Sequence, residues 1–325
     1  MRIENITLNE ERNVTLTAFL QEVEGEFWYV PKRPAILVIP GGGYQFCSDR
    51  EAEPVAFSYL KAGFQAFILR YSVGKDAAWP VPLMDYEEAM ALIRSRAEEW
   101  KIYEDKIGVI GFSAGGHLAA AAATMAKNRP NAAILGYGVM GEDVKACNET
   151  APDTIAAVDR STCPCFLFSS RTDNVVPVAN TLRFMQALAD HDVAFESHIY
   201  AYGPHGFSTA DTSIQYKDTV MCPRTRSWVE DSIGWLKDVL GEFGVGGMAE
   251  PVCKWHLTDD GEPWLSVDCT LGCLLGSEEA KEVLEPVFAA KSQEANVEAL
   301  PRNMRLRDIL GYGRTPEDVV AGLQE

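Results

Sequence analysis

One serine stands in a pattern that would make it a nucleophile. Ser113 is the centre of the pentapeptide GFSAG (111–115), which follows an apolar run and precedes the alanine-rich run 114–125. Glycines around a serine allow a sharp turn from strand to helix that exposes the hydroxyl. The positive end of the following helix favours the negative charge that develops during nucleophilic attack. The pattern predicts a catalytic serine, and a glycine-rich packing turn is the alternative.

A histidine and an aspartate follow at positions suited to activating this serine. His205 lies in YGPHGF (202–207), after the last expected strand, and Asp173 lies in SRTDNVVP (170–177), after an earlier one. A serine hydroxyl needs a base within hydrogen-bond reach. A carboxylate on the other ring nitrogen would hold the histidine in its working orientation. We predict that His205 is the general base and Asp173 its partner. In the alternative, Asp173 only caps the helix that begins near residue 177.

Attack on a carbonyl group creates an oxyanion that needs backbone N–H donors. The N–H of Ala114, the residue after the nucleophile, is one expected donor. The segment IPGGGY (39–44) is expected to supply another, because its glycines let the backbone turn N–H groups toward a substrate. Such a loop can instead cradle phosphate, but no Gly-Lys-Ser/Thr follows it here.

The elements expected around these motifs alternate between strands and helices. Strands are predicted over 14–20, 35–39, 65–71, 106–111, 132–137, 165–170 and 194–200, and helices over 51–62, 82–100, 114–125, 178–189 and 225–240. This alternation predicts an α/β fold with a mostly parallel sheet flanked by helices. In such sheets, functional loops lie beyond the carboxyl ends of the strands, where the motifs above are found.

The chain is expected to divide after the closing helix, at FGVGG (243–247). We predict a catalytic domain over 1–247 and a small, mainly helical C-terminal domain over 248–325. Within the latter we expect a short strand pair over 253–269 and helices over 271–289 and 306–324, with further helix around 292–299. Its expected role is docking or oligomer contact. Trp255 and Trp264 could bind carbohydrate, although isolated tryptophans more often pack in a core.

The composition excludes several classes of partner. A formal net charge of -18 repels phosphate backbones and anionic lipid surfaces, so we expect no nucleic-acid and no membrane partner. The start of the chain lacks a signal-peptide pattern and no apolar run is long enough to span a membrane, which predicts a cytoplasmic protein. The eight cysteines are scattered without metal-ligand spacings, so we expect reduced thiols and no metal. The sequence leaves open whether the chain forms a homo-oligomer.

With these motifs in place, the chain up to about residue 240 resembles the α/β-hydrolase esterases, and within them the acetyl-esterase and acetyl-xylan-esterase-like branch. The segments that carry the resemblance are PGGGY (40–44), DREAEPVA (49–56), PVPLMDYEEAMALIRSRA (80–97), GFSAGGHLAA (111–120), SRTDNVVP (170–177) and YGPHGF (202–207). The chain order serine, aspartate, histidine is also that of this family.

The resemblance implies a serine carboxylesterase that hydrolyses short acyl esters, chiefly acetyl groups on carbohydrates, through an acyl-enzyme and without a cofactor. It assigns Ser113, Asp173 and His205 to a catalytic triad, and it assigns the oxyanion hole to Gly42, Gly43 and Ala114. One position departs from the family pattern. Many relatives carry histidine before the glycines, where this chain has Pro40, so the support of the loop must differ.

Side chains that flank the catalytic loops are candidates for a substrate pocket, and ordinary packing is the alternative for each. They are Tyr44, Phe46, Trp79, Asn174, Val175 and Phe207. Segments 141–160 and 208–223 are candidates for a cap over the site. The same machinery would also serve an arylformamidase, a feruloyl esterase or a peptidase. A non-catalytic binding protein is disfavoured by the complete set of motifs.

Overall fold

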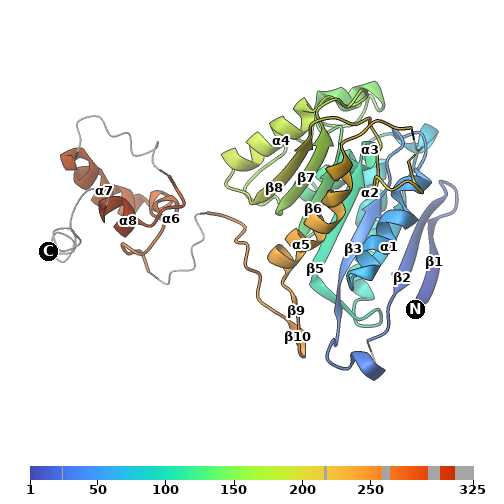
Figure 1. Cartoon of the computed structure of the whole chain (residues 1–325), viewed down its shortest axis with the longest axis horizontal. Helices are drawn as coiled ribbons and strands as arrows, with labels where there is room; N and C mark the ends of the chain where they lie inside the picture. The colour runs from blue at the N-terminus through green and yellow to red at the C-terminus, as the bar shows by residue number, and fades with distance from the viewer. Residues whose placement is uncertain (24, 216–217, 258–263, 292–300, 312–325) are drawn as a thin grey trace. The chain divides into compact units, whose positions relative to one another are not determined.

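Eight strands form a single sheet in the first part of the chain, in the order β1-β2-β4-β3-β5-β6-β7-β8 (Figure 1). The strands are β1 (Arg2–Asn9), β2 (Val14–Leu20), β3 (Arg33–Ile39), β4 (Gln65–Arg70), β5 (Ile102–Phe112), β6 (Ala132–Gly136), β7 (Cys165–Ser170) and β8 (Phe195–Tyr200). β2 runs antiparallel to both β1 and β4, and the pairs from β4 through β3 to β8 are all parallel. The predicted mostly parallel α/β sheet is therefore confirmed.

This computed structural model describes residues 1–23, 25–215, 218–257, 264–291 and 301–311. By its contacts the chain forms two units, Met1–Cys253 and Lys254–Glu325. The division falls close to the domain boundary predicted after residue 247. None of the helices in the described ranges is long and apolar enough to cross a membrane.

Helices cover both faces of the sheet (Figure 1). α1 (Glu53–Lys61) and α5 (Trp228–Leu240) pack on one face, and α2 (Val81–Ser95), α3 (Ala114–Thr124) and α4 (Ala179–Asp190) pack on the other. Successive side chains of a strand point to opposite faces. In β3, Leu37 therefore joins the core under α2 and α3, whereas Ile36 and Val38 join the core under α1 and α5. Burial on both faces explains the continuous apolar runs of these strands.

Three elements differ from the sequence prediction. Strand β1 was not predicted, because its alternating polar residues pair only at the edge of the sheet. The helix expected over 82–100 ends at Ser95. Residues beyond it continue as turns, although Ala97 and Trp100 are buried and so mimic helical spacing. The segment 243–247, where the domain boundary was predicted, lies in a small hairpin of β9 (Phe243–Gly244) and β10 (Gly247–Met248).

The second unit has a small apolar core of its own. Its helices are α6 (Leu271–Leu275), α7 (Glu278–Lys291) and α8 (Leu306–Gly311). Leu271, Leu274 and Leu284 meet Leu306 and Leu310 in this core. The described residues of 253–269 carry no strand, so the predicted strand pair is not found there, and the helix predicted over 271–289 is split in two. The helix expected around 292–299 and the end of that expected over 306–324 lie outside the described residues.

Short 3-10 turns complete the structure. They are η1 (Gly25–Phe27), η2 (Asp49–Glu51), η3 (Gly74–Asp76), η4 (Glu142–Ala146) and η5 (Pro223–Ser227). The turn η2 lies between the end of β3 and α1, so it sits beside the glycine loop of residues 41–43.

Candidate active site

Ser113 occupies the sharp turn between β5 and α3. Its backbone has φ of 53°, which an L-residue adopts only under strain of about 1–3 kcal/mol. The surrounding glycines are a steric requirement. A Cβ at Gly111 would lie 2.0 Å from the carbonyl oxygen of Gly115, and a Cβ at Gly115 would lie 2.2 Å from that of Ile39. The bend therefore brings β3, β5 and α3 into backbone contact and leaves the serine half-buried at the sheet edge.

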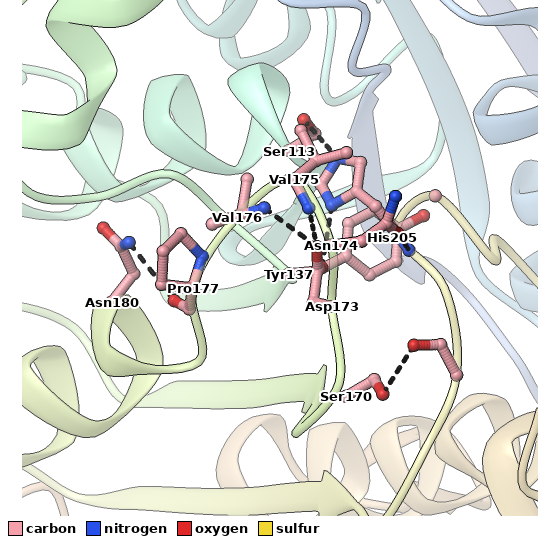
Figure 2. Close-up of polar contacts among 12 residues, drawn as sticks. Ser113, Tyr137, Ser170, Asp173, Asn174, Val175, Val176, Pro177, Asn180 and His205 are labelled. Atoms are coloured by element: carbon pink, nitrogen blue, oxygen red, sulfur yellow. Dashed lines mark hydrogen bonds and ion pairs between the residues drawn. The ribbon is translucent and has the colours of Figure 1, made fainter.

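A continuous chain of hydrogen bonds joins Ser113, His205 and Asp173 (Figure 2). The distance from Ser113 Oγ to His205 Nε2 is 2.9 Å, and His205 Nδ1 lies 2.8 Å from Asp173 Oδ2. Only 1% of the Asp173 side chain and 15% of the His205 side chain are exposed. The three residues come from the ends of β5, β7 and β8, which the parallel sheet brings to one edge.

The donor and acceptor roles in this chain follow from the chemistry of the partners. A carboxylate only accepts hydrogen bonds, so Nδ1 of His205 must carry the proton that bonds to Asp173. In the neutral ring, Nε2 then has its lone pair free to accept the hydroxyl proton of Ser113. This is the tautomer that can act as a general base toward the serine.

Backbone amides hold the Asp173 carboxylate in place. Its Oδ1 atom accepts hydrogen bonds of 2.8 Å from the N–H groups of both Val175 and Val176 (Figure 2). Its other oxygen is thereby aimed at the histidine. The helix-capping alternative for this aspartate is only partly met, because these amides precede α4, which begins at Ala179.

Reciprocal hydrogen bonds join the aspartate loop to the histidine loop. The hydroxyl of Thr172 donates to the carbonyl oxygen of Gly203 at 3.1 Å and accepts from the N–H of the same residue at 3.0 Å. Asn174 Oδ1 accepts from the N–H of His205 at 3.3 Å. These contacts fix the separation of the two loops and so the length of the Asp173–His205 hydrogen bond.

The glycine loop after β3 lies against the serine. A Cβ at Gly41 would lie 3.0 Å from Ser113 Cβ, and the backbone at Gly42 and Gly43 has φ of 130° and 61°, which favours glycine. Within the described part of the chain, no group accepts a hydrogen bond from the N–H groups of Gly42, Gly43 or Ala114. These N–H groups are therefore available to a bound oxyanion.

Two buried residues near the site were missed by the sequence reasoning. Glu51, only 3% exposed, accepts a hydrogen bond from the N–H of Gly41 at 2.9 Å and another from the hydroxyl of Tyr137 at 2.7 Å. The Tyr137 ring packs edge-on against the His205 ring, with centroids 5.1 Å apart. The place of Tyr137 directly after β6, at a strand's carboxyl end, could have indicated its role. No comparable sequence pattern indicated a role for Glu51.

His117 links the glycine loop to the segment 141–160. The residue is fully buried, and its Nε2 lies 2.8 Å from the carbonyl oxygen of Pro152, to which it must donate. Its Nδ1 therefore accepts from the Tyr44 hydroxyl, 2.6 Å away. Burial lowers the pKa of the His117 imidazole from 6.5 to about 4, so the ring is neutral at neutral pH. His117 is part of α3, the helix that follows the serine, and its ring is buried there.

The six pocket candidates fall into two groups. Tyr44 and Phe207 are fully buried, so their side chains support the loops by packing and offer no surface to a substrate. The other four are at least partly accessible: Phe46 is 59% exposed, Val175 is 64% exposed, Asn174 is exposed and Trp79 is half-buried. The Trp79 ring packs edge-on against the His117 ring, and the backbone N–H of Trp79 donates to the hydroxyl oxygen of Thr150 at 2.7 Å. It therefore borders the segment 141–160.

No group of three or more histidine, cysteine, aspartate or glutamate residues in the described ranges could hold a metal ion. Six of the cysteines are free thiols: Cys47, Cys147, Cys163, Cys165, Cys222 and Cys269. The hydrogen-bonded Ser–His–Asp chain at the edge of a mostly parallel sheet is the arrangement of a hydrolytic enzyme that uses a serine nucleophile.

Comparisons with known proteins agree with this class. Residues 29–137 match the BD-FAE family, and residues 143–222 match the prolyl oligopeptidase family. The chain is 43% identical to MGS-M1, an α/β-hydrolase enzyme from a Medee basin deep-sea metagenome library. The TM-score is 0.70, and the match covers 74% of this chain and 98% of that one. The chain belongs to the α/β-hydrolase family of enzymes.

Two curated relatives carry more specific names. An acetylxylan esterase of Xylanibacter ruminicola is 27% identical over 257 residues, which cover 72% of this chain and 50% of the relative. Endo-1,4-beta-xylanase B of Butyrivibrio fibrisolvens is 30% identical over 211 residues, or 55% of this chain and 33% of the relative. The chain thus spans between a third and about half of the length of the curated relatives it matches.

Proposed function

We propose that the chain is a serine carboxylesterase that removes short acyl groups, chiefly acetyl, from carbohydrate esters. The observation that carries this proposal is the hydrogen-bonded chain from Ser113 through His205 to Asp173. Beside it lie backbone N–H groups for which the described residues supply no acceptor. The curated relative named acetylxylan esterase supports the substrate class. The proposed substrate is a small acylated molecule, and the reaction requires no cofactor.

The proposed mechanism uses an acyl-enzyme. Ser113 Oγ attacks the ester carbonyl carbon while His205 Nε2 takes the hydroxyl proton, and Asp173 stabilises the imidazolium that forms. The oxyanion accepts hydrogen bonds from Ala114 and from the glycine loop, at Gly42 or Gly43. His205 then gives its proton to the leaving alkoxide, and the C–O bond to the alcohol breaks. Water, deprotonated by the same nitrogen, releases the acid and restores the serine.

The accessible aromatic side chains beside the site suit a sugar ester. Phe46 extends from the glycine loop into solvent, and Trp79 borders the segment 141–160 while remaining partly accessible. A flat ring at the rim of a site can stack on the apolar face of a sugar. We therefore expect Trp79 to contribute to binding of the alcohol part of the ester.

The test is acetate release from acetylated xylo-oligosaccharides, with p-nitrophenyl acetate as the control substrate. The proposal expects turnover of both substrates by the wild type and none above background by Ser113→Ala. Trp79→Ala should raise KM for the oligosaccharide while leaving p-nitrophenyl acetate turnover nearly unchanged. Cleavage of the nitrophenyl ester alone would remove acetylated xylan from the proposal, and turnover of neither ester would refute esterase activity.

A peptidase is the second candidate, because residues 143–222 match the prolyl oligopeptidase family. The same serine chemistry cleaves amides when the leaving amine is protonated. A panel of p-nitroanilide peptides, including prolyl ones, would distinguish the two candidates. Amide turnover that exceeds ester turnover in kcat/KM would favour the peptidase.

A further inference from the structure

Glu51 is a buried carboxylate that touches both halves of the catalytic arrangement. It lies in η2 and is only 3% exposed. Its Oε2 accepts from the N–H of Gly41, the first residue of the glycine loop, at 2.9 Å. Its Oε1 accepts from the Tyr137 hydroxyl at 2.7 Å. Its two hydrogen bonds are the main compensation for its burial, and attraction to His205 and Arg50 adds to them.

Tyr137 extends this contact to the histidine loop. Its hydroxyl accepts a hydrogen bond from the N–H of Ser208 at 3.0 Å, so its own proton is committed to Glu51. Its ring packs against the rings of both His205 and Phe207, with centroids 5.1 Å and 4.8 Å away. The carboxylate therefore links the oxyanion loop at one oxygen to the loop of the general base at the other.

The hydrogen-bond pattern favours the ionised form of Glu51. Both of its partners donate hydrogen bonds to it. The N–H of Gly41 can only donate, and the Tyr137 hydroxyl accepts from the N–H of Ser208 and donates its own proton to Glu51. Burial raises the pKa of the Glu51 carboxyl, and the hydrogen bond from Tyr137 opposes this rise. Burial without hydrogen-bond donors would favour the neutral carboxylic acid. The two donors therefore stabilise the carboxylate against the effect of burial.

We propose that Glu51 is a positioning residue that fixes the oxyanion loop and the His205 loop relative to each other. The inference rests on the proposed function, because both loops matter only if Ser113 attacks a carbonyl group. Glu51 itself does not touch the reacting atoms. Its contribution is to hold the donors of Gly42 and Gly43 and the ring of His205 where the transition state needs them.

Glu51→Gln tests this role with little change in volume. An amide can still accept from Gly41 through its oxygen, but its NH2 group then faces Tyr137 and cannot accept the hydroxyl proton. The substitution also removes a buried charge, whose desolvation opposes folding at neutral pH. We expect kcat for p-nitrophenyl acetate to fall roughly ten- to a hundredfold, since small displacements of catalytic groups have effects of this size. KM should change little, because the ground-state contacts remain.

Tyr137→Phe is the second variant, because it removes only the hydroxyl and keeps the ring against His205. Glu51→Gln and Tyr137→Phe should each lower kcat, and the double variant should be little worse than the single ones, because they break the same contact. Glu53→Gln is the matched control. Glu53 is two residues further on, partly exposed and paired with Arg70, so its loss should leave kcat unchanged.

The measurement is kcat per active site, with the sites counted by end-point labelling with a fluorophosphonate, alongside the melting temperature of each variant. The proposal expects a lower kcat per labelled site for Glu51→Gln at a temperature where the variant is folded. An unchanged kcat per site, with only a lower melting temperature, would overturn it in favour of a structural role. If the wild type and Glu53→Gln also fail to turn over the ester, the proposed function fails and this inference fails with it.

Discussion

Protonation of His117 should destabilise the first unit in mildly acidic solution. Its imidazole is fully buried between Tyr44 and Pro152, and burial lowers its pKa from 6.5 to about 4. An unfolded chain would bind a proton at this histidine near pH 6.5, whereas the folded chain would bind it only near pH 4. Between these values the unfolded state holds more protons, so the free energy of unfolding falls as pH falls.

The size of the effect follows from the difference in pKa. One pKa unit corresponds to about 1.4 kcal/mol, so the full loss between pH 6.5 and pH 4 is about 3 kcal/mol. At pH 5 the loss would be about 2 kcal/mol. In a unit of this size that lowers the melting temperature by roughly 4–8 °C. Above pH 6.5 this loss of stability is absent.

Urea denaturation of the wild type and His117→Gln between pH 7.5 and pH 5 would isolate this contribution. Glutamine can accept from Tyr44 and donate to Pro152 but does not titrate in this range. His117→Gln should therefore lose about 2 kcal/mol less stability than the wild type between pH 7.5 and pH 5. His191→Gln, at an exposed position after α4, is the control and should keep the wild-type pH dependence. Parallel curves for the wild type and His117→Gln would refute the reasoning.

Two further predictions follow from the geometry of the site. Asp173→Asn should lower kcat by about 10⁴, because an amide N–H toward His205 would favour the wrong tautomer, and ester kinetics would check it. A residual rate near that of the wild type would contradict the role of the carboxylate. Gly115→Ala should lower the melting temperature or the yield of folded protein, since its Cβ would lie 2.2 Å from a carbonyl oxygen. Gly234→Ala, in α5 with open space around it, should leave the melting temperature unchanged or raise it slightly. Equal melting temperatures for Gly115→Ala and the wild type would show that the turn is less tightly packed.

The sheet and the hydrogen-bonded arrangement of Ser113, His205 and Asp173 could be predicted because the motifs that determine them are local. Strands β3, β6 and β7 and the second half of β5 (107–112) are buried on both faces, so their sequences are largely continuous apolar runs. The pentapeptide around Ser113 needs glycines for steric reasons that act within a few residues and across one neighbouring strand. Once the strands run parallel, their carboxyl ends meet at one edge, so loops far apart in sequence must gather there.

The contacts of Glu51 and His117 could not be predicted, because they depend on partners far away in the chain. Glu51 is buried only because Gly41 and Tyr137 supply donors from two other loops. Its acidic neighbours in DREAEPVA resemble an ordinary solvent-facing helix start. For a related reason, the sequence left open which pocket candidates are buried, as Tyr44 and Phe207 are. It places them next to the predicted catalytic residues but does not tell which way a side chain points from an irregular loop.

Covalent labelling of the wild type tests the central claim most directly. The folded protein would be treated with a fluorophosphonate, and the modified residue would be mapped by peptide mass spectrometry. The account predicts a single adduct on Ser113, which disappears in Ser113→Ala and forms much more slowly in Asp173→Asn. An adduct on another residue, or no adduct in folded protein, would contradict a nucleophilic role for Ser113.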